Sequence, residues 1–179
     1  MSYAIMEYNR RHAVAYARRW ANGRNPLFAD YTGLGGDCTN FISQCVLAGG
    51  CEMNFTPVYG WYYLSEGERT ASWTGVAFFA QFLVGNTGPG PFASETDDGS
   101  LQLGDVIQLG KADGSFYHTL IVTGFRYDGY LVCAHTDDAL DRPLSTYTYE
   151  AARFLHIEGV RFALPAVDSC FERLMAGGV

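Results

Sequence analysis

Basic residues are scarce in this chain, and the shortage excludes one large class of function. The 179 residues hold 12 Lys and Arg against 19 Asp and Glu, which gives a formal net charge of −7. Proteins that bind nucleic acids neutralise phosphates with a basic stripe or patch, and none is visible here. We therefore expect no nucleic-acid partner, and the acidity also disfavours adsorption to anionic surfaces.

Long apolar runs and a leader pattern are lacking as well. No apolar run reaches the roughly 18 residues that a membrane-spanning helix needs, so we expect no membrane insertion. The N-terminal stretch "MSYAIMEYNRRHAV" does not show the basic-then-apolar order of a secretory signal. We expect a cytoplasmic protein, or an extracellular one only if this chain is a module cut from a longer secreted protein.

Paired cysteine spacing is missing too. The chain has an odd set of five cysteines, Cys38, Cys45, Cys51, Cys133 and Cys170. A disulfide framework is therefore not expected, and at least one thiol should be free. We interpret the four cysteines after Cys38 as core or incidental residues. Close-spaced Cys or His pairs and calcium-loop spacing are also lacking, so we expect neither a metal nor a cofactor.

What the sequence does contain is enough apolar material for a folded core. Hydrophobic residues make up 48% and aromatic residues 15% of the chain. This composition predicts a single domain over residues 1–179, with its core at about 8–164.

The hydrophobic periodicity changes from helical to strand-like along the chain. Helical spacing predicts helices over 10–21, 37–48 and 75–84, the second one stopped by Gly49-Gly50. A turn-rich connector (85–100) comes next. Strand patterns follow at 105–109, 117–125 and 130–136, with a hairpin loop at 126–129, a fourth strand within 154–164 and a short helix near 166–175. Helices followed by an antiparallel sheet predict the α+β class.

Cys38 stands where the second predicted helix begins, behind Gly33, Gly35 and Gly36, and Asp37 is a good N-cap residue. A thiol attacks a carbonyl carbon well only as the thiolate, which a helix N-terminus favours by about 0.3–1 kcal/mol. One pKa unit is worth about 1.36 kcal/mol, so the helix alone lowers the thiol pKa by less than a unit. A neighbouring imidazolium must supply the rest.

His118 is the best candidate for that imidazole. Alternation puts His118 on one face of its strand with Leu120 and Val122, and we expect this face to pack on the helix that starts at Cys38. If residues 126–129 form a four-residue loop, His118 faces Asp137, and His135 lies diagonally about 7–8 Å away. A three-residue loop would move His135 to the far face.

These residue types together suit acyl transfer by a thiol. Cys38 would attack an amide carbonyl, and His118 would hold the thiolate and later protonate the leaving amine. His135 would orient His118, with Asp137 and Asn40 as rivals for that role, and Asp37 could help to position Cys38. Backbone N–H groups at the helix start, including that of Cys38, would hold the oxyanion. By pattern alone, Cys38 fits a core thiol better than a nucleophile, and His118 fits a structural histidine and a base equally well.

A family resemblance decides between these interpretations. The segments Tyr8-Asn9-Arg10, Asn25-Pro26, Gly36-Asp37-Cys38-Thr39-Asn40-Phe41 and Ser43-Gln44-Cys45 resemble the start of the bacterial putative amidase domain family, which is similar to NlpC-type papain-like peptidases. The segments "GDVIQL", "YHTLIVTG" and "AHTDD" look like its histidine-bearing strands, and the resemblance spans about residues 8–158.

The resemblance implies a papain-like (NlpC-type) α+β fold with Cys38 as the nucleophile, His118 as the base and, by analogy with NlpC-type enzymes, His135 as the third group. It implies hydrolysis of a peptide-like amide bond through a thioester, with a cell-wall peptide as the natural substrate. The alternatives are a papain-like binding module without turnover and, last, a metal site built from Cys38, His118 and His135.

Overall fold

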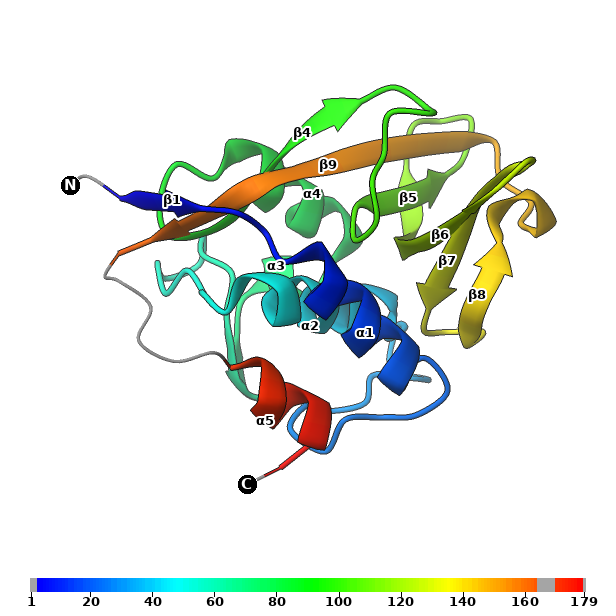
Figure 1. Ribbon diagram of the computed structural model, residues 1–179. Helices are drawn as coiled ribbons and strands as arrows, with labels where there is room; N and C mark the ends of the chain where they lie inside the picture. The colour runs from blue at the N-terminus through cyan, green and yellow to red at the C-terminus, as the bar shows by residue number, and fades with distance from the viewer. Residues whose placement is uncertain (1–2, 164–169, 179) are drawn as a thin grey trace.

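The computed structural model describes residues 3–163 and 170–178. It places helices against one side of a seven-stranded sheet, with α1 and α2 lying below the long strand β9 (Figure 1). The helices are α1 (Arg10–Trp20), α2 (Cys38–Gly50), α3 (Ala71–Thr74), α4 (Val76–Gly85) and α5 (Phe171–Ala176), with a 3-10 turn η1 at Leu144–Thr146. None of the described helices is both long and apolar enough to cross a bilayer.

The strands of the main sheet pair antiparallel throughout, in the order β1-β9-β5-β6-β7-β8, with β4 also paired to β9. They are β1 (Ala4–Met6), β4 (Gly90–Thr96), β5 (Val106–Gly110), β6 (Phe116–Arg126), β7 (Gly129–Ala134), β8 (Ala139–Pro143) and β9 (Ala151–Phe162). A separate hairpin joins β2 (Tyr63–Ser65) to β3 (Glu68–Arg69). Helices on an antiparallel sheet confirm the predicted α+β class.

The sheet separates two apolar clusters because side chains alternate along each strand. On the helix side, Ile121 and Cys133 pack with Phe41 and Ile42 of α2. On the other side, the neighbouring strand residues, Leu120 among them, form a second cluster with Tyr130 and Leu144. Neighbouring side chains of β6 therefore point to opposite sides of the sheet, and this alternation decides which of them can reach α2.

Three predicted helices are present, but the second runs further than expected. α2 includes Gly49 and Gly50 and ends at Cys51, which has φ 52°. Gly49 is there for packing rather than as a stop signal: a Cβ on Gly49 would lie 2.2 Å from a ring carbon of Tyr8. The short helix α3 was not predicted.

The predicted strands at 105–109, 117–125 and 130–136, the hairpin loop and the fourth strand are all present as β5, β6, β7 and β9, with Arg126 paired to Gly129 across the loop. The third of them ends at Ala134, because Thr136 and Asp137 have φ of 60° and 65°. The connector at 85–100 was wrong as a whole, since it contains β4. Gly and Pro are typical of turns, so this edge strand was not predicted from the sequence pattern. The predicted closing helix is seen from Phe171 onward, and its expected start near 166 lies outside the described residues.

One cysteine expectation was wrong. Cys51, at the end of α2, forms a disulfide with Cys170, which is 119 residues further along the chain. Spacing in the sequence cannot show such a contact, because the fold creates it. Cys38, Cys45 and Cys133 are free and buried, so the expectation of a free thiol is confirmed.

Candidate active site

The segment before Cys38 turns sharply, and glycine makes that turn possible. Gly33, Gly35 and Gly36 have φ of 82°, 103° and 108°, a region that side chains with a Cβ rarely adopt. The segment folds back so that Leu34 N and Gly36 N both donate to the carbonyl of Tyr31. α2 then starts at Cys38, which is only 7% exposed.

Asp37 is 1% exposed, and its carboxylate ties the glycine segment to the helix. One oxygen accepts from Tyr31 N (3.0 Å) and from Asn40 Nδ2 (2.8 Å), and the other lies 2.6 Å from Nδ1 of His135. Asp37 occupies the predicted N-cap position, but its side chain does not cap the helix. Within the described residues, no acceptor is bonded to the N–H groups of Cys38 and Thr39. Unpaired N–H groups at a helix start are donors of the kind that can bind an anion.

His118 lies at the start of β6, partly buried, with its ring 6.1 Å from that of Tyr147. Burial lowers the pKa of His118 to about 4. The charge of Asp137 raises this pKa, whereas the charge of Arg142 lowers it further. The ring is therefore an uncharged imidazole at neutral pH, a form that can accept a proton.

The residues that follow Cys38 and His118 in the chain are in direct contact. Thr39 Oγ1 and Thr119 Oγ1 share a hydrogen bond of 2.9 Å, so the start of α2 touches the start of β6. In the described part of the chain, the one hydrogen bond of Cys38 Sγ is a long contact of 3.8 Å to Thr39 Oγ1, and none joins it to His118.

The face of β6 that packs on the helix is the opposite of the expected one. Thr119 and Ile121 point to α2, whereas Leu120 and Val122, which share the parity of His118, belong to the second cluster. His118 is therefore not on the face that covers the helix, and the charge of Asp137 acts on its ring.

His135 is buried (1% exposed) and has its ring nitrogens occupied by groups other than His118. Nδ1 lies 2.6 Å from Asp37 Oδ2, Nε2 lies 2.8 Å from the carbonyl oxygen of Trp20, and the ring stacks on Phe41 at 3.7 Å. The expected diagonal approach to His118 is not what these contacts show.

A bulge in β6 explains the difference. Arg126 pairs with Gly129, so the loop is two residues long rather than the predicted four, but the register beside it is the predicted one and would place His118 opposite Asp137. Between Val122 and Gly124 the register shifts by one residue, so that Ile121 faces Cys133. Continuing this register puts His135 opposite Thr119, on the helix side of the sheet, and Thr136 opposite His118.

The two rivals for the third position are placed differently. Asn40 is 1% exposed and donates to Ala29 O and Asp37 Oδ1, while its own oxygen accepts from Trp73 Nε1. Its amide is thus engaged in holding the loop. Asp137 is exposed, is bonded to no other described residue and acts electrostatically on His118.

Two further residues of the site were missed by the sequence reasoning. Arg24 binds Asp138 through both terminal nitrogens (2.9 and 3.0 Å) and lies 3.3 Å from Nε2 of His135. Thr136 accepts a hydrogen bond from Asp37 N at 2.8 Å. Arg24 stands in no motif, and Thr136 was quoted only as part of the segment "AHTDD". Both residues meet their partners across about 100 residues of chain, so no local signal shows these contacts.

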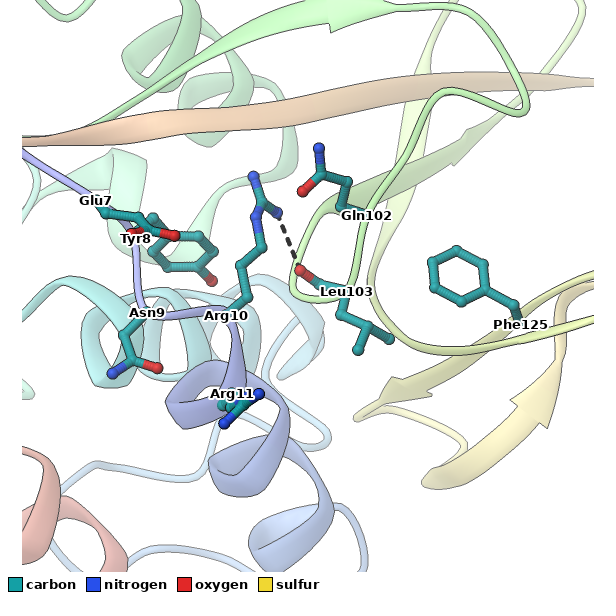
Figure 2. A pocket seen from close by; sticks show the side chains of 8 residues that line it. All are labelled: Glu7, Tyr8, Asn9, Arg10, Arg11, Gln102, Leu103 and Phe125. Atoms are coloured by element: carbon teal, nitrogen blue, oxygen red, sulfur yellow. Dashed lines mark hydrogen bonds between the residues drawn. The ribbon is translucent and has the colours of Figure 1, made fainter.

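Two pockets lie elsewhere on the protein. Figure 2 shows one of about 650 Å³, where Arg10 reaches from α1 to the carbonyl of Leu103 (2.9 Å) and also ion-pairs with Asp105 (2.6 Å). The other, of about 660 Å³, lies between α4 and residues 54–59. Neither pocket is lined by Cys38 or His118. Nδ1 of His156 lies 2.7 Å from the carboxylate of Asp105, the same carboxylate that pairs with Arg10. Across residues 3–163 and 170–178, no group of three or more His, Cys, Asp or Glu side chains could hold a metal ion.

The fold and this site fit a hydrolase of the amidase class. The family model described as Putative amidase domain matches residues 7–157, and the chain therefore belongs to that family, whose description names amide hydrolysis. Over 119 residues the chain is 37% identical to a Bacillus subtilis (strain 168) protein called "Uncharacterized protein YhbB". This match covers 65% of the chain but only 37% of the relative, so the chain spans little more than a third of that protein. No solved structure matches.

Proposed function

We propose that this chain is a cysteine-dependent amidase or peptidase of papain-like, NlpC-type fold, with Cys38 as nucleophile and His118 as base. The observation that carries the proposal is the Thr39–Thr119 hydrogen bond of 2.9 Å, which joins the residue after Cys38 to the residue after His118. The family membership supports amide hydrolysis as the reaction.

The uncharged state of His118 supports general-base catalysis rather than a preformed ion pair. As Sγ of Cys38 attacks the amide carbonyl carbon, its proton passes to the imidazole. The N–H groups of Cys38 and Thr39 stabilise the oxyanion, and the imidazolium then gives its proton to the leaving amine. A thioester remains on Cys38. Water attacks it while His118 takes the water proton, the acid product leaves, and the thiol is restored.

Asp137 is the third group in this proposal. It is the carboxylate whose charge favours the protonated form of His118, so it would stabilise the imidazolium that forms in each step. Its neighbour Thr136 is bonded to Asp37 N, which keeps the Thr136–Asp137 turn beside the start of α2.

A cell-wall peptide is the proposed substrate, by the resemblance to NlpC-type peptidases. The disulfide between Cys51 and Cys170 supports work in an oxidising compartment, because such bonds persist outside the reducing cytosol. The resemblance thus supports a bacterial wall peptide as the substrate, and the disulfide supports a reaction outside the cytosol.

A second candidate function is a papain-like binding module without turnover. The observation that favours it is the low exposure of Cys38 (7%), together with the position of both pockets away from it. The two candidates differ in whether the thiol of Cys38 reacts.

The deciding measurement is iodoacetamide labelling of the folded protein near neutral pH, read by peptide mass spectrometry. We expect Cys38 to react at least about tenfold faster than Cys45 and Cys133, which are fully buried. His118→Asn should slow the labelling of Cys38, and Cys38→Ala should abolish hydrolysis of wall stem peptides, whereas the control Cys45→Ala should retain both. Equal slow labelling with binding of the peptides would support the binding module, and hydrolysis by Cys38→Ala would overturn the cysteine mechanism.

A further inference from the structure

His135 is the site histidine whose contacts differ most from the role that the family resemblance implies. Its two ring nitrogens lie 2.6 Å from the carboxylate of Asp37 and 2.8 Å from the carbonyl of Trp20. With both nitrogens occupied, the ring has no hydrogen bond to give to His118. Phe41, one turn into α2, stacks on it with an interplanar angle of 9° and fixes its plane.

The contacts of Asp37 lead from His135 to the nucleophile. Besides His135, the carboxylate holds Tyr31 N and Asn40 Nδ2, which lie on either side of the glycine segment and the helix start. Cys38 is the next residue in the chain. A displaced Asp37 carboxylate would therefore release Tyr31 and shift the backbone N–H of Cys38 at the same time.

The second connection runs through the turn after β7. Asp37 N donates to Thr136 Oγ1 at 2.8 Å, and a Cβ on Gly36 would lie 3.4 Å from that same oxygen. Thr136 follows His135 and precedes Asp137. His135 and Asp37 thus set the distance between the segment that carries the nucleophile and the turn that carries the acidic group.

Resting on the proposed function, we propose that His135 is a positioning residue, which acts through Asp37 on the start of α2 and does not orient His118. Arg24 supports this pair from the surface side, 3.7 Å from Asp37 and bound to Asp138. The carboxylate whose charge acts on His118 is that of Asp137, and the two roles respond differently to mutation.

The test combines a labelling rate with the titration of one ring. His135→Leu should slow iodoacetamide labelling of Cys38 on the order of a hundredfold, the cost of a small misplacement of a reacting group. The pKa of His118, followed by NMR, should stay as in the wild type. Asp137→Asn is the matched control: it should lower the pKa of His118, because it removes the charge that raises it.

A double-mutant cycle tests the path through Asp37. If His135 acts through that carboxylate, Asp37→Asn and His135→Leu together should slow labelling no more than the slower single variant. Rates that multiply, or a His118 pKa that moves in His135→Leu, would overturn the proposal.

A conservative variant separates positioning from general stability. His135→Asn keeps a donor near the place of Nδ1, so labelling should recover to within about tenfold of wild type, that is, within about 1.4 kcal/mol. If His135→Leu cannot be purified, His135→Asn decides alone: an unchanged His118 titration supports the proposal, and a shifted one overturns it. The wild-type labelling pattern tests the proposed function separately, since it involves no change at His135.

Discussion

At the residue scale, burial of His118 links the charge of the proposed base to the stability of the whole protein. Its pKa is about 4 in the folded protein, against an ordinary value of 6.5. The unfolded chain therefore binds more protons between these two values, and stability falls as the pH falls. The stability that the uncharged His118 ring contributes is present in full above about pH 6.5 and is lost progressively as the pH falls toward 4.

We predict that His118→Asn reduces the acid sensitivity of folding. Between pH 7 and pH 5, the His118 shift alone should lower the free energy of unfolding by about 2 kcal/mol in the wild type. His118→Asn should lose about that much less over the same interval. Urea unfolding of both proteins at the two pH values gives the difference, and parallel losses in both would contradict the burial of an uncharged ring.

The sequence alone identified several of these residues but not their relations. Asp37 and Cys38 were readable from local signals, because capping preference and helical spacing act within one turn. The contact of Asp37 with His135 was not, because it joins positions 98 residues apart and depends on one extra residue in β6. No local sequence pattern indicates a bulge of one residue, yet the bulge changes which face of the sheet each later side chain points to, relative to the neighbouring strand.

At the element scale, α2 packs so closely on the N-terminal segment and on β9 that two of its positions accept only glycine or a costly shift. A Cβ on Gly49 would lie within 3 Å of three ring carbons of Tyr8. That ring is not free to move, because its hydroxyl donates to the carbonyl of Gly104 at 3.1 Å. A Cβ on Gly50 would lie 3.0 Å from Val160 of β9.

We predict that Gly49→Ala destabilises the protein by about 1–3 kcal/mol, the usual cost of overpacking. The matched control is Gly85→Ala at the end of α4, where a Cβ meets nothing within 4 Å. Alanine there should be neutral or stabilising by up to about 1 kcal/mol, because glycine is the poorer helix residue. Urea midpoints that move equally in the two variants would argue against the Tyr8 contact.

The same glycines show why element boundaries were harder to predict than elements. Gly49-Gly50 reads as a helix stop in a single sequence, but here tertiary packing selects small residues inside the helix. β4 was missed for a related reason, since Gly90 and Pro91 suggest turns. They are tolerated because β4 lies at an edge, paired to β9 alone.

At the scale of the whole molecule, the disulfide between Cys51 and Cys170 connects the end of α2 to the segment leading into α5. It closes a loop over a sequence separation of 119 residues. In the chain-entropy view, a bond across so long a loop removes much of the conformational freedom of the unfolded state. The stability of the described fold should therefore depend on the redox conditions.

We predict that reduction lowers the free energy of unfolding by about 4 kcal/mol. Urea unfolding with and without dithiothreitol measures the effect. The Cys51→Ser, Cys170→Ser double variant should be as stable as the reduced wild type, and dithiothreitol should not change its stability. Finding five reactive thiols in the non-reduced, denatured protein would show that the bond does not form.

β9 has a consequence for how this protein is made. Three strands, β1, β4 and β5, pair with it, and it is the last strand within the described residues. During translation the paired groups of β1 and β4, and those of β5 on the side away from β6, stay without their partner until Ala151–Phe162 leaves the ribosome. The nascent polypeptide therefore completes its sheet late, in one closing event, and until then it presents open strand edges of the kind that chaperones protect.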